Sequence, residues 1–217
     1  MQTHFPLVLD MADKACLVVG GGEVATRKAE ALMHAQARVT VIAPEATAQI
    51  AEWAAEGLLD WRQEPFSTHE LKKYTLVVAA TNRTDVNLAV WQAVKEVDGW
   101  INIVDRPDLC NFIVPSTVQR GKLVIAISTS GASPGLARKI RQQVEQEIGP
   151  EYESYVDFLA AVRGQVMKTV SDTTQRKKIF RQLLDDRFLL ADDEQRYQMA
   201  ETLINQVLGE GLVRRQQ

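Results

Sequence analysis

Three consecutive glycines separate a short apolar run from an amphipathic stretch in the segment CLVVGGGEVATRKAEAL, residues 16–32. Gly20, Gly22 and Ala25 form the pattern G-x-G-x-x-A between a predicted strand and a predicted helix. The first glycine suits a tight turn, the second has no Cβ to hinder a pyrophosphate, and the alanine allows close helix–strand packing. The free N–H groups that begin the helix favour the same anion. The pattern predicts a dinucleotide-binding turn, and the alternative is a glycine-rich turn without a ligand.

A candidate ligand for the ribose follows the next apolar run, RVTVIAPE. Glu45 ends this run, a little later than the usual position of the carboxylate that binds the adenosine ribose. No arginine stands beside it to bind a 2′-phosphate, which favours NAD over NADP. The alternative is a solvated carboxylate at a helix start.

An aspartate ends the apolar run WINIVD. Ligands of an open parallel sheet bind beyond the carboxyl ends of its strands, so Asp105 is expected to face the cleft near the nicotinamide. An aspartate before Arg-Pro also often shapes a turn, and this alternative stays open. Asp108 is nearby but lies past Pro107 in the turn.

A hydroxyl-rich loop, STSGASPG at 128–135, leads into another helix start and predicts a second anion site. Its candidate substrate-binding residues are Ser128, Ser130, Gly131 and Ser133. Arg138 on the following helix is a further candidate, with Lys139 and Arg141 close in sequence. For these three cations, a solvated basic face is the alternative.

Composition disfavours several other functions. The 217-residue chain has 25 Lys and Arg against 28 Asp and Glu, so it has no global basic field that would gather nucleic acid. No apolar stretch approaches the length of a membrane span. His4, His34 and His69 have no partners at metal-ligand spacing, and two cysteines make neither a zinc site nor a disulfide framework. We expect no resident metal, no nucleic-acid partner and no membrane partner.

The elements that must position these residues alternate along the first half of the chain. Strand patterns are expected at 15–20, 38–44, 59–64, 74–82 and 100–105, and helices at 23–36, 46–57 and 84–97. Strands separated by helix-length segments predict a parallel sheet with right-handed crossovers.

The pattern changes after Pro107. Two strand patterns around Arg120-Gly121 predict an antiparallel hairpin, and Ser133-Pro134 begins a helix that Gly149-Pro150 ends. From residue 151 the chain is expected to be helical, with helix starts at Asp172 and Asp192. The expected fold is α/β: a Rossmann-like parallel sheet at 1–113, a small α+β dimerisation segment at 114–150 and an all-helical C-terminal domain at 151–217.

Four motifs occur one after another along the chain: CLVVGGGEVATRKAEAL, VVAATN, NIVDRPDLCNFIVPS and AISTSGASPGLARKIR. Over about residues 3–150, the chain resembles the precorrin-2 dehydrogenase/sirohydrochlorin ferrochelatase family of siroheme biosynthesis. That family includes the N-terminal module of trifunctional siroheme synthase and stand-alone relatives. The tail after residue 150 resembles the helical end of the stand-alone members more loosely.

The resemblance implies an NAD-dependent oxidation of precorrin-2, a tetrapyrrole, to sirohydrochlorin. In some members, the same cleft also inserts Fe²⁺. It also implies a homodimer in which the segment after the Rossmann domain is exchanged or packed between subunits. By resemblance, cofactor contacts fall at Glu23, Val24, Pro44 and Glu45, with Thr81 of the second motif added to them. The family's acid/base aspartate falls at Asp105.

Two further expectations concern location and an alternative function. The N-terminus has no basic region followed by an apolar one, so we expect no signal peptide and a cytoplasmic enzyme. The alternative to an enzyme is a nucleotide-sensing regulatory Rossmann module. Such a module needs the glycines and the ribose carboxylate, but not Asp105 or the loop at 128–135.

Overall fold

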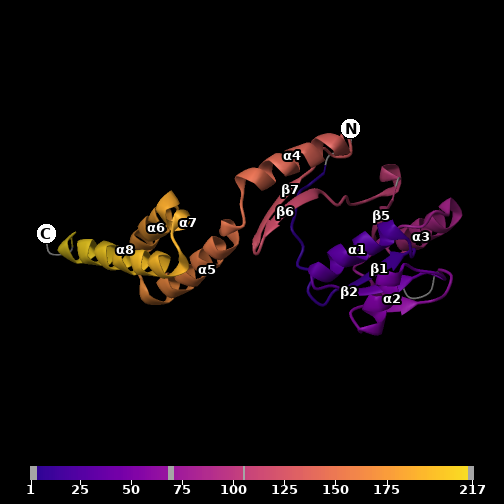
Figure 1. Cartoon of the computed structure of the whole chain (residues 1–217), viewed down its shortest axis with the longest axis horizontal. Coiled ribbons are helices and arrows are strands. Elements are labelled where there is room, and N and C mark those ends of the chain that lie inside the picture. The colour runs from indigo at the N-terminus through magenta and orange to yellow at the C-terminus, as the bar shows by residue number, and fades with distance from the viewer. Residues whose placement is uncertain (1–3, 68–70, 105, 215–217) are drawn as a thin grey trace. The chain divides into compact units, whose positions relative to one another are not determined.

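The computed structural model describes residues 4–67, 71–104 and 106–214. The chain divides into two compact units, Met1–Val114 and Pro115–Gln217 (Figure 1). Two core clusters lie in the first unit, and a third lies in the second.

A five-stranded parallel sheet forms the centre of the first unit, in the order β3-β2-β1-β4-β5. Its strands are β1 (Ala15–Val19), β2 (Arg38–Ile42), β3 (Asp60–Arg62), β4 (Leu76–Ala79) and β5 (Trp100–Ile103). The register places Val18 beside both Val41 and Val78. Strands buried on both faces read as continuous apolar runs, which is why β1 and β4 were visible in the sequence.

Helices cover both faces of this sheet. They are α1 (Glu23–His34), α2 (Ala48–Ala55) and α3 (Thr84–Glu96), with two 3₁₀ turns, η1 (Leu71–Lys73) and η2 (Pro107–Leu109). Val18 shares one core with Ala25 of α1 and Ile50 of α2, whereas Leu17 shares the other with Val90 of α3. Successive side chains of a strand point to opposite faces, so α3 covers the face opposite α1 and α2. The sheet is therefore doubly wound, with its strand order reversing beside β1.

The second unit begins with a hairpin and a helix. Strands β6 (Ser116–Arg120) and β7 (Leu123–Ile127) pair antiparallel, and Gly121 supplies the positive φ of +53° in the turn. Helix α4 (Pro134–Glu147) lies along this hairpin (Figure 1). The Arg120 Nε donates to the Ile148 carbonyl oxygen at 3.1 Å and so ties the hairpin to the end of α4.

Four helices complete the second unit: α5 (Glu151–Thr169), α6 (Thr173–Gln182), α7 (Asp186–Leu190) and α8 (Asp193–Arg214). Their core includes Phe158, Ile179 and Phe188, which are almost fully buried. Arg196 of α8 is also buried and donates to the carbonyl oxygens of Phe188 at 2.7 Å and Ala191 at 2.8 Å. Its guanidinium therefore joins the end of α7 to the start of α8.

The expected fold class is confirmed, and the differences are local. The helix expected from residue 46 begins at Ala48, because Thr47 is its N-cap. Asp172 caps α6 as expected, and the Asp192 carboxylate accepts from the Gln195 N–H at 2.8 Å. Helix α7 was not predicted separately, and the division into three parts at 113 and 150 stays a prediction. Within the described ranges, no helix combines the length and apolarity needed to cross a membrane.

Candidate cofactor site

A pocket of about 830 Å³ opens at the carboxyl ends of the parallel strands. Its walls are the segments that follow β1, β2, β3 and β4, together with Val104 after β5. All seven predicted cofactor contacts line it: Gly20, Gly22, Glu23, Val24, Pro44, Glu45 and Thr81. The structure thus brings together residues as distant in the sequence as Gly20 and Thr81, which are 61 positions apart. Their contacts with a cofactor stay a prediction.

The first two glycines are required by close approach of the main chain. Gly20 has a φ of +122°, and its N–H donates to the Ile42 carbonyl oxygen at 3.0 Å. A Cβ at Gly20 would overlap the Ala80 carbonyl oxygen, and one at Gly21 would overlap that of Glu45. Sequence reasoning treated Gly21 as a free position of the motif, although the run of three glycines was a signal for it.

Gly22 differs from these two, because a Cβ there would meet no protein atom within 4 Å. It lines the pocket in an extended conformation, and its carbonyl oxygen accepts the first hydrogen bond of α1, from the Thr26 N–H at 2.9 Å. The missing side chain leaves the N-terminus of a 12-residue helix open to the pocket. Backbone N–H groups and the helix dipole favour an anion at this place, so the residues fit a dinucleotide pyrophosphate.

Two threonines fix the turn after β1 to the turn after β2. The hydroxyl oxygens of Thr26 and Thr47 lie 2.8 Å apart, and the Thr47 N–H donates to the Gly21 carbonyl oxygen at 2.9 Å. Thr47 also caps α2 by accepting from the Ile50 N–H. Of these roles, only the N-cap could be predicted from the sequence, because threonine is common directly before a helix.

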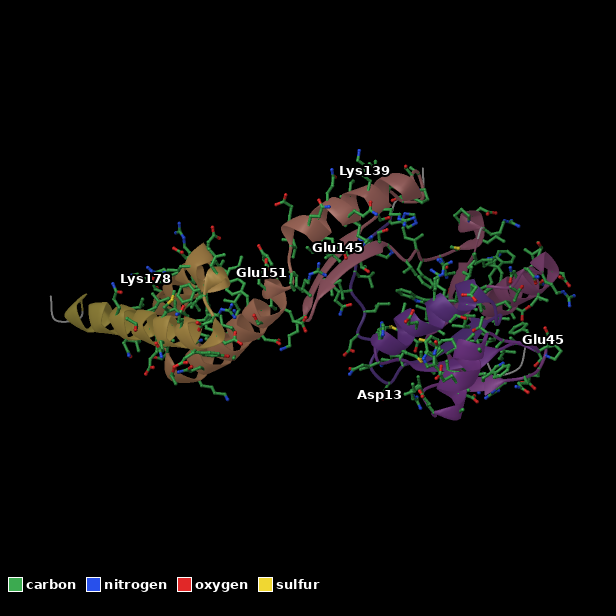
Figure 2. The ribbon with its side chains drawn as sticks, in the orientation of Figure 1. Asp13, Glu45, Lys139, Glu145, Glu151 and Lys178 are labelled. Atoms are coloured by element: carbon green, nitrogen blue, oxygen red, sulfur yellow. The ribbon has the colours of Figure 1, made fainter. Side chains whose placement is uncertain are left out.

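Glu45 lies on this fixed segment with its side chain exposed, and Figure 2 shows it at the edge of the first unit. The Trp61 indole also holds this segment, because its Nε1 donates to the Ala43 carbonyl oxygen at 3.0 Å. Of the described residues that line the pocket, Arg83 alone is cationic. It follows β4 instead of β2 and forms an ion pair with Asp85.

A buried asparagine holds the segment after β4. The Asn87 Oδ1 accepts from the Thr81 hydroxyl at 2.7 Å and from the Thr81 N–H at 3.3 Å. Its Nδ2 donates to the Thr81 carbonyl oxygen at 3.0 Å. Sequence reasoning missed Asn87, which has the appearance of an ordinary polar residue on an amphipathic helix.

The predicted base, Asp105, lies outside the described residues. Val104, directly before it, lines the pocket. The chain after β5 is anchored back to that strand, because the Cys110 Sγ accepts from the Ile103 N–H at 3.1 Å and the Asn111 Oδ1 from the Ile101 N–H at 2.8 Å. Burial raises the pKa of the Cys110 thiol, so it stays protonated near neutral pH.

Asp108 is engaged in the turn. Its carboxylate accepts two hydrogen bonds from Arg106, at 3.0 Å from Nε and 2.8 Å from the terminal nitrogen. The Arg106 guanidinium therefore holds the pKa of Asp108 below its usual range. A carboxylate held in this way is a weaker base than a free one.

The predicted substrate-binding residues lie together in the second unit. Ser130 and Gly131 have successive positive φ angles of +53° and +85°, and the Ser130 N–H donates to the Ser128 hydroxyl at 3.0 Å. Ser133 caps α4, as expected, by accepting from the Leu136 N–H at 3.3 Å. The hydroxyl group of Ser130 is exposed. Contacts of these residues with a substrate stay a prediction.

The basic residues of α4 do not share one environment. Arg141 pairs with Glu145, whereas Arg138 and Lys139 are exposed. Figure 2 shows Lys139 on the side of α4 away from the hairpin. Arg138 therefore remains a candidate for an anionic ligand. Elsewhere, the described parts of the chain contain no group of three or more His, Cys, Asp and Glu residues arranged to hold a metal ion.

Three family models match successive segments of the chain. Residues 7–116 match a family described as putative NAD(P)-binding, and residues 120–147 match the central part of sirohaem biosynthesis proteins. Residues 152–197 match the SirC C-terminal domain. The chain belongs to the precorrin-2 dehydrogenase/sirohydrochlorin ferrochelatase family. The pocket thus lies in the part of the chain that matches the NAD(P)-binding family.

Individual members of the family extend this result. The chain is 39% identical to a siroheme synthase of Nitrosospira multiformis over 86% of its length, and 40% identical to that of Methylobacillus flagellatus over 83%. It covers 40% and 38% of these two proteins. A solved structure, SirC, precorrin-2 dehydrogenase, is similar at a TM-score of 0.77 and 29% identity, with 95% of this chain and 100% of that one covered.

Proposed function

We propose that this chain is an NAD-dependent dehydrogenase that oxidises precorrin-2 to sirohydrochlorin in siroheme biosynthesis. The observation that supports this most directly is the pocket: a glycine turn open to an anion, in a chain similar to a precorrin-2 dehydrogenase over that protein's whole length. A regulatory nucleotide-sensing module would also have the pocket. The similarity through the central and C-terminal segments favours the enzyme.

The chain's own residues bind and orient the cofactor. The α1 N-terminus beside Gly22 binds the pyrophosphate, and the Glu45 carboxylate accepts hydrogen bonds from the adenosine ribose. No cation lies beside Glu45 among the described lining residues to bind a 2′-phosphate, which supports NAD over NADP. When bound, NAD⁺ supplies the hydride acceptor.

Oxidation of precorrin-2 removes a hydride and a proton. We infer that Asp105 accepts the proton, because it follows Val104 of the pocket wall. A positioned carboxylate contributes about 10²–10⁴-fold to such a step. The neighbouring Asp108 is less suited, since Arg106 lowers its pKa.

The second unit is proposed to bind the carboxylates of the tetrapyrrole. Ser130 and Arg138 are exposed, and the Ser130 hydroxyl and the Arg138 guanidinium are suited to anions. We also propose a cytoplasmic homodimer. Its support is exposed apolar surface on the hairpin and on α4: the side chains of Val124 on β7 and Leu136 on α4 are 43% and 48% exposed. Sedimentation velocity at micromolar concentration tests the dimer, which a monomer would contradict.

The decisive assay follows NADH absorbance after precorrin-2 is added to the chain with NAD⁺. We expect reduction by the wild type, and at least a tenfold lower rate for Asp105→Ala with unchanged NAD⁺ affinity. Asp108→Ala is the matched control and should keep most of the rate. No NADH from the wild type would contradict the proposed function. Repeating the assay with Fe²⁺ and following siroheme absorbance tests iron insertion, which the family resemblance implies.

A further inference from the structure

The pocket continues on both sides of the glycine turn. In the sheet order β3-β2-β1-β4-β5, the lining segments form a row: Pro65 and Phe66 after β3, Pro44 and Glu45 after β2, then the glycines, Thr81 and Val104. A dinucleotide with its pyrophosphate at the glycines must place one end over β2 and β3 and the other over β4 and β5. Its two ends therefore meet different side chains.

The side over β2 and β3 is apolar beyond Glu45. Phe66 is the one aromatic residue among the described residues that line the pocket. It is half-buried and packs on the core that contains Ile42, Leu71 and Tyr74, while another part of it lines the pocket. Phe66 is thus packed against the core and also contributes to the pocket wall.

The segments that carry this apolar surface are preorganised. Proline restricts the backbone at Pro44 and Pro65. The Ala43 N–H donates to the Arg62 carbonyl oxygen at 3.1 Å, which continues the pairing of β2 with β3 past the strand ends. A surface that is already ordered loses little entropy when a flat ring binds to it.

We propose that Phe66, with Pro44 and Pro65, forms the platform on which the adenine ring of NAD stacks. Aromatic side chains stack on nucleobases through their faces. Adenine over β2 and β3 places the nicotinamide over β4 and β5, where Val104 leads into the predicted base. This inference rests on the proposed function and adds a specificity-determining residue outside the glycine motif.

The test measures binding of three ligands, NAD⁺, AMP and nicotinamide mononucleotide, by calorimetry. Phe66→Ala should weaken NAD⁺ and AMP by about tenfold, the typical loss of one base–aromatic stack, and leave nicotinamide mononucleotide unchanged. Phe66→Trp should restore the affinity for AMP. Trp91→Ala is the matched control, because Trp91 is half-buried against the same core and does not line the pocket.

The outcomes separate the two proposals. Unchanged AMP affinity in Phe66→Ala, or an equal loss for AMP and nicotinamide mononucleotide, would overturn the platform while wild-type NAD⁺ binding upholds the proposed function. Failure of the wild type to bind NAD⁺ would overturn both.

Discussion

The cofactor pocket of the first unit and the serine-rich loop of the second are both strand-to-helix turns, but different interactions hold them. The glycine turn is fixed by main-chain contacts with β2 and the segment that follows it, such as the hydrogen bonds Gly20 N–H to Ile42 and Thr47 N–H to Gly21. The loop at 128–133 is held by hydrogen bonds among its own residues and the first turn of α4.

This difference shows what a motif can specify. In the glycine turn, the backbone itself lines the pocket, so the pattern of small residues specifies the proposed binding surface. In the serine loop, the hydroxyls serve first as turn and cap acceptors. Their pattern therefore specifies a helix start, and the proposed binding of a substrate depends on side chains that the pattern leaves exposed.

The largest expected effect separates two neighbouring glycines. Gly21→Ala places a methyl group against the Glu45 carbonyl oxygen, which is held in place, so we expect a loss of about 3 kcal/mol or more in the free energy of unfolding. Gly22→Ala meets no protein atom and should unfold like the wild type, but bind NAD⁺ more weakly because the methyl occupies the phosphate's approach. Thermal unfolding and NAD⁺ titration of both variants measure this. Equal stability of the two would show that the main-chain contact is not restrictive.

A smaller effect is expected where a side chain holds the pocket wall. Asn87→Leu removes three hydrogen bonds to Thr81 and should lower the free energy of unfolding by about 2 kcal/mol. The KM for NAD⁺ should rise more than kcat falls, since the Thr81 segment lines the pocket but does not react. Asn87→Asp keeps the acceptor for the Thr81 N–H and hydroxyl but places a carboxylate oxygen against the Thr81 carbonyl oxygen, so it should also weaken NAD⁺ binding. A fall in kcat at unchanged KM would contradict a positioning role.

The smallest effects are expected in the serine loop. Ser133→Ala removes the N-cap of α4 and should cost about 1 kcal/mol in denaturant unfolding. Ser130→Ala should change stability by less than about 0.5 kcal/mol, because its side chain is exposed, and raise the KM for precorrin-2. If neither variant alters the KM for precorrin-2, the loop only starts helix α4 and binds no substrate, unlike the proposed role of the glycine turn.

Local signals explain what the sequence could predict. Buried runs marked the strands, the caps Ser133 and Asp172 marked helix starts, and the glycines marked the turn, since each depends on residues close in the chain. The pocket walls required contacts between distant segments. The pair Thr26–Thr47 spans 21 positions, and Phe66 reaches the pocket only because β3 lies at the sheet edge beside β2.

The burial of the Arg196 guanidinium could not be predicted from the sequence either. Arg196 is 3% exposed and donates to backbone oxygens around α7, but its neighbours in the sequence, DDEQRYQ, are those of a solvated helix start. A cation becomes an internal connector only when several carbonyl oxygens converge on it. That convergence belongs to the packing of α7 and α8 and has no local pattern.

Gly21 lies close to the main chain of Glu45, so it constrains the backbone at position 45 but not the side chain. This difference has an evolutionary consequence. The Glu45 carbonyl oxygen is confined by the glycine, while the carboxylate is exposed at the pocket rim. Selection can therefore exchange the side chain that we propose binds the ribose without disturbing the fold. We therefore expect a lineage of this protein to change its preference between NAD and NADP through position 45 and to keep the glycine at position 21.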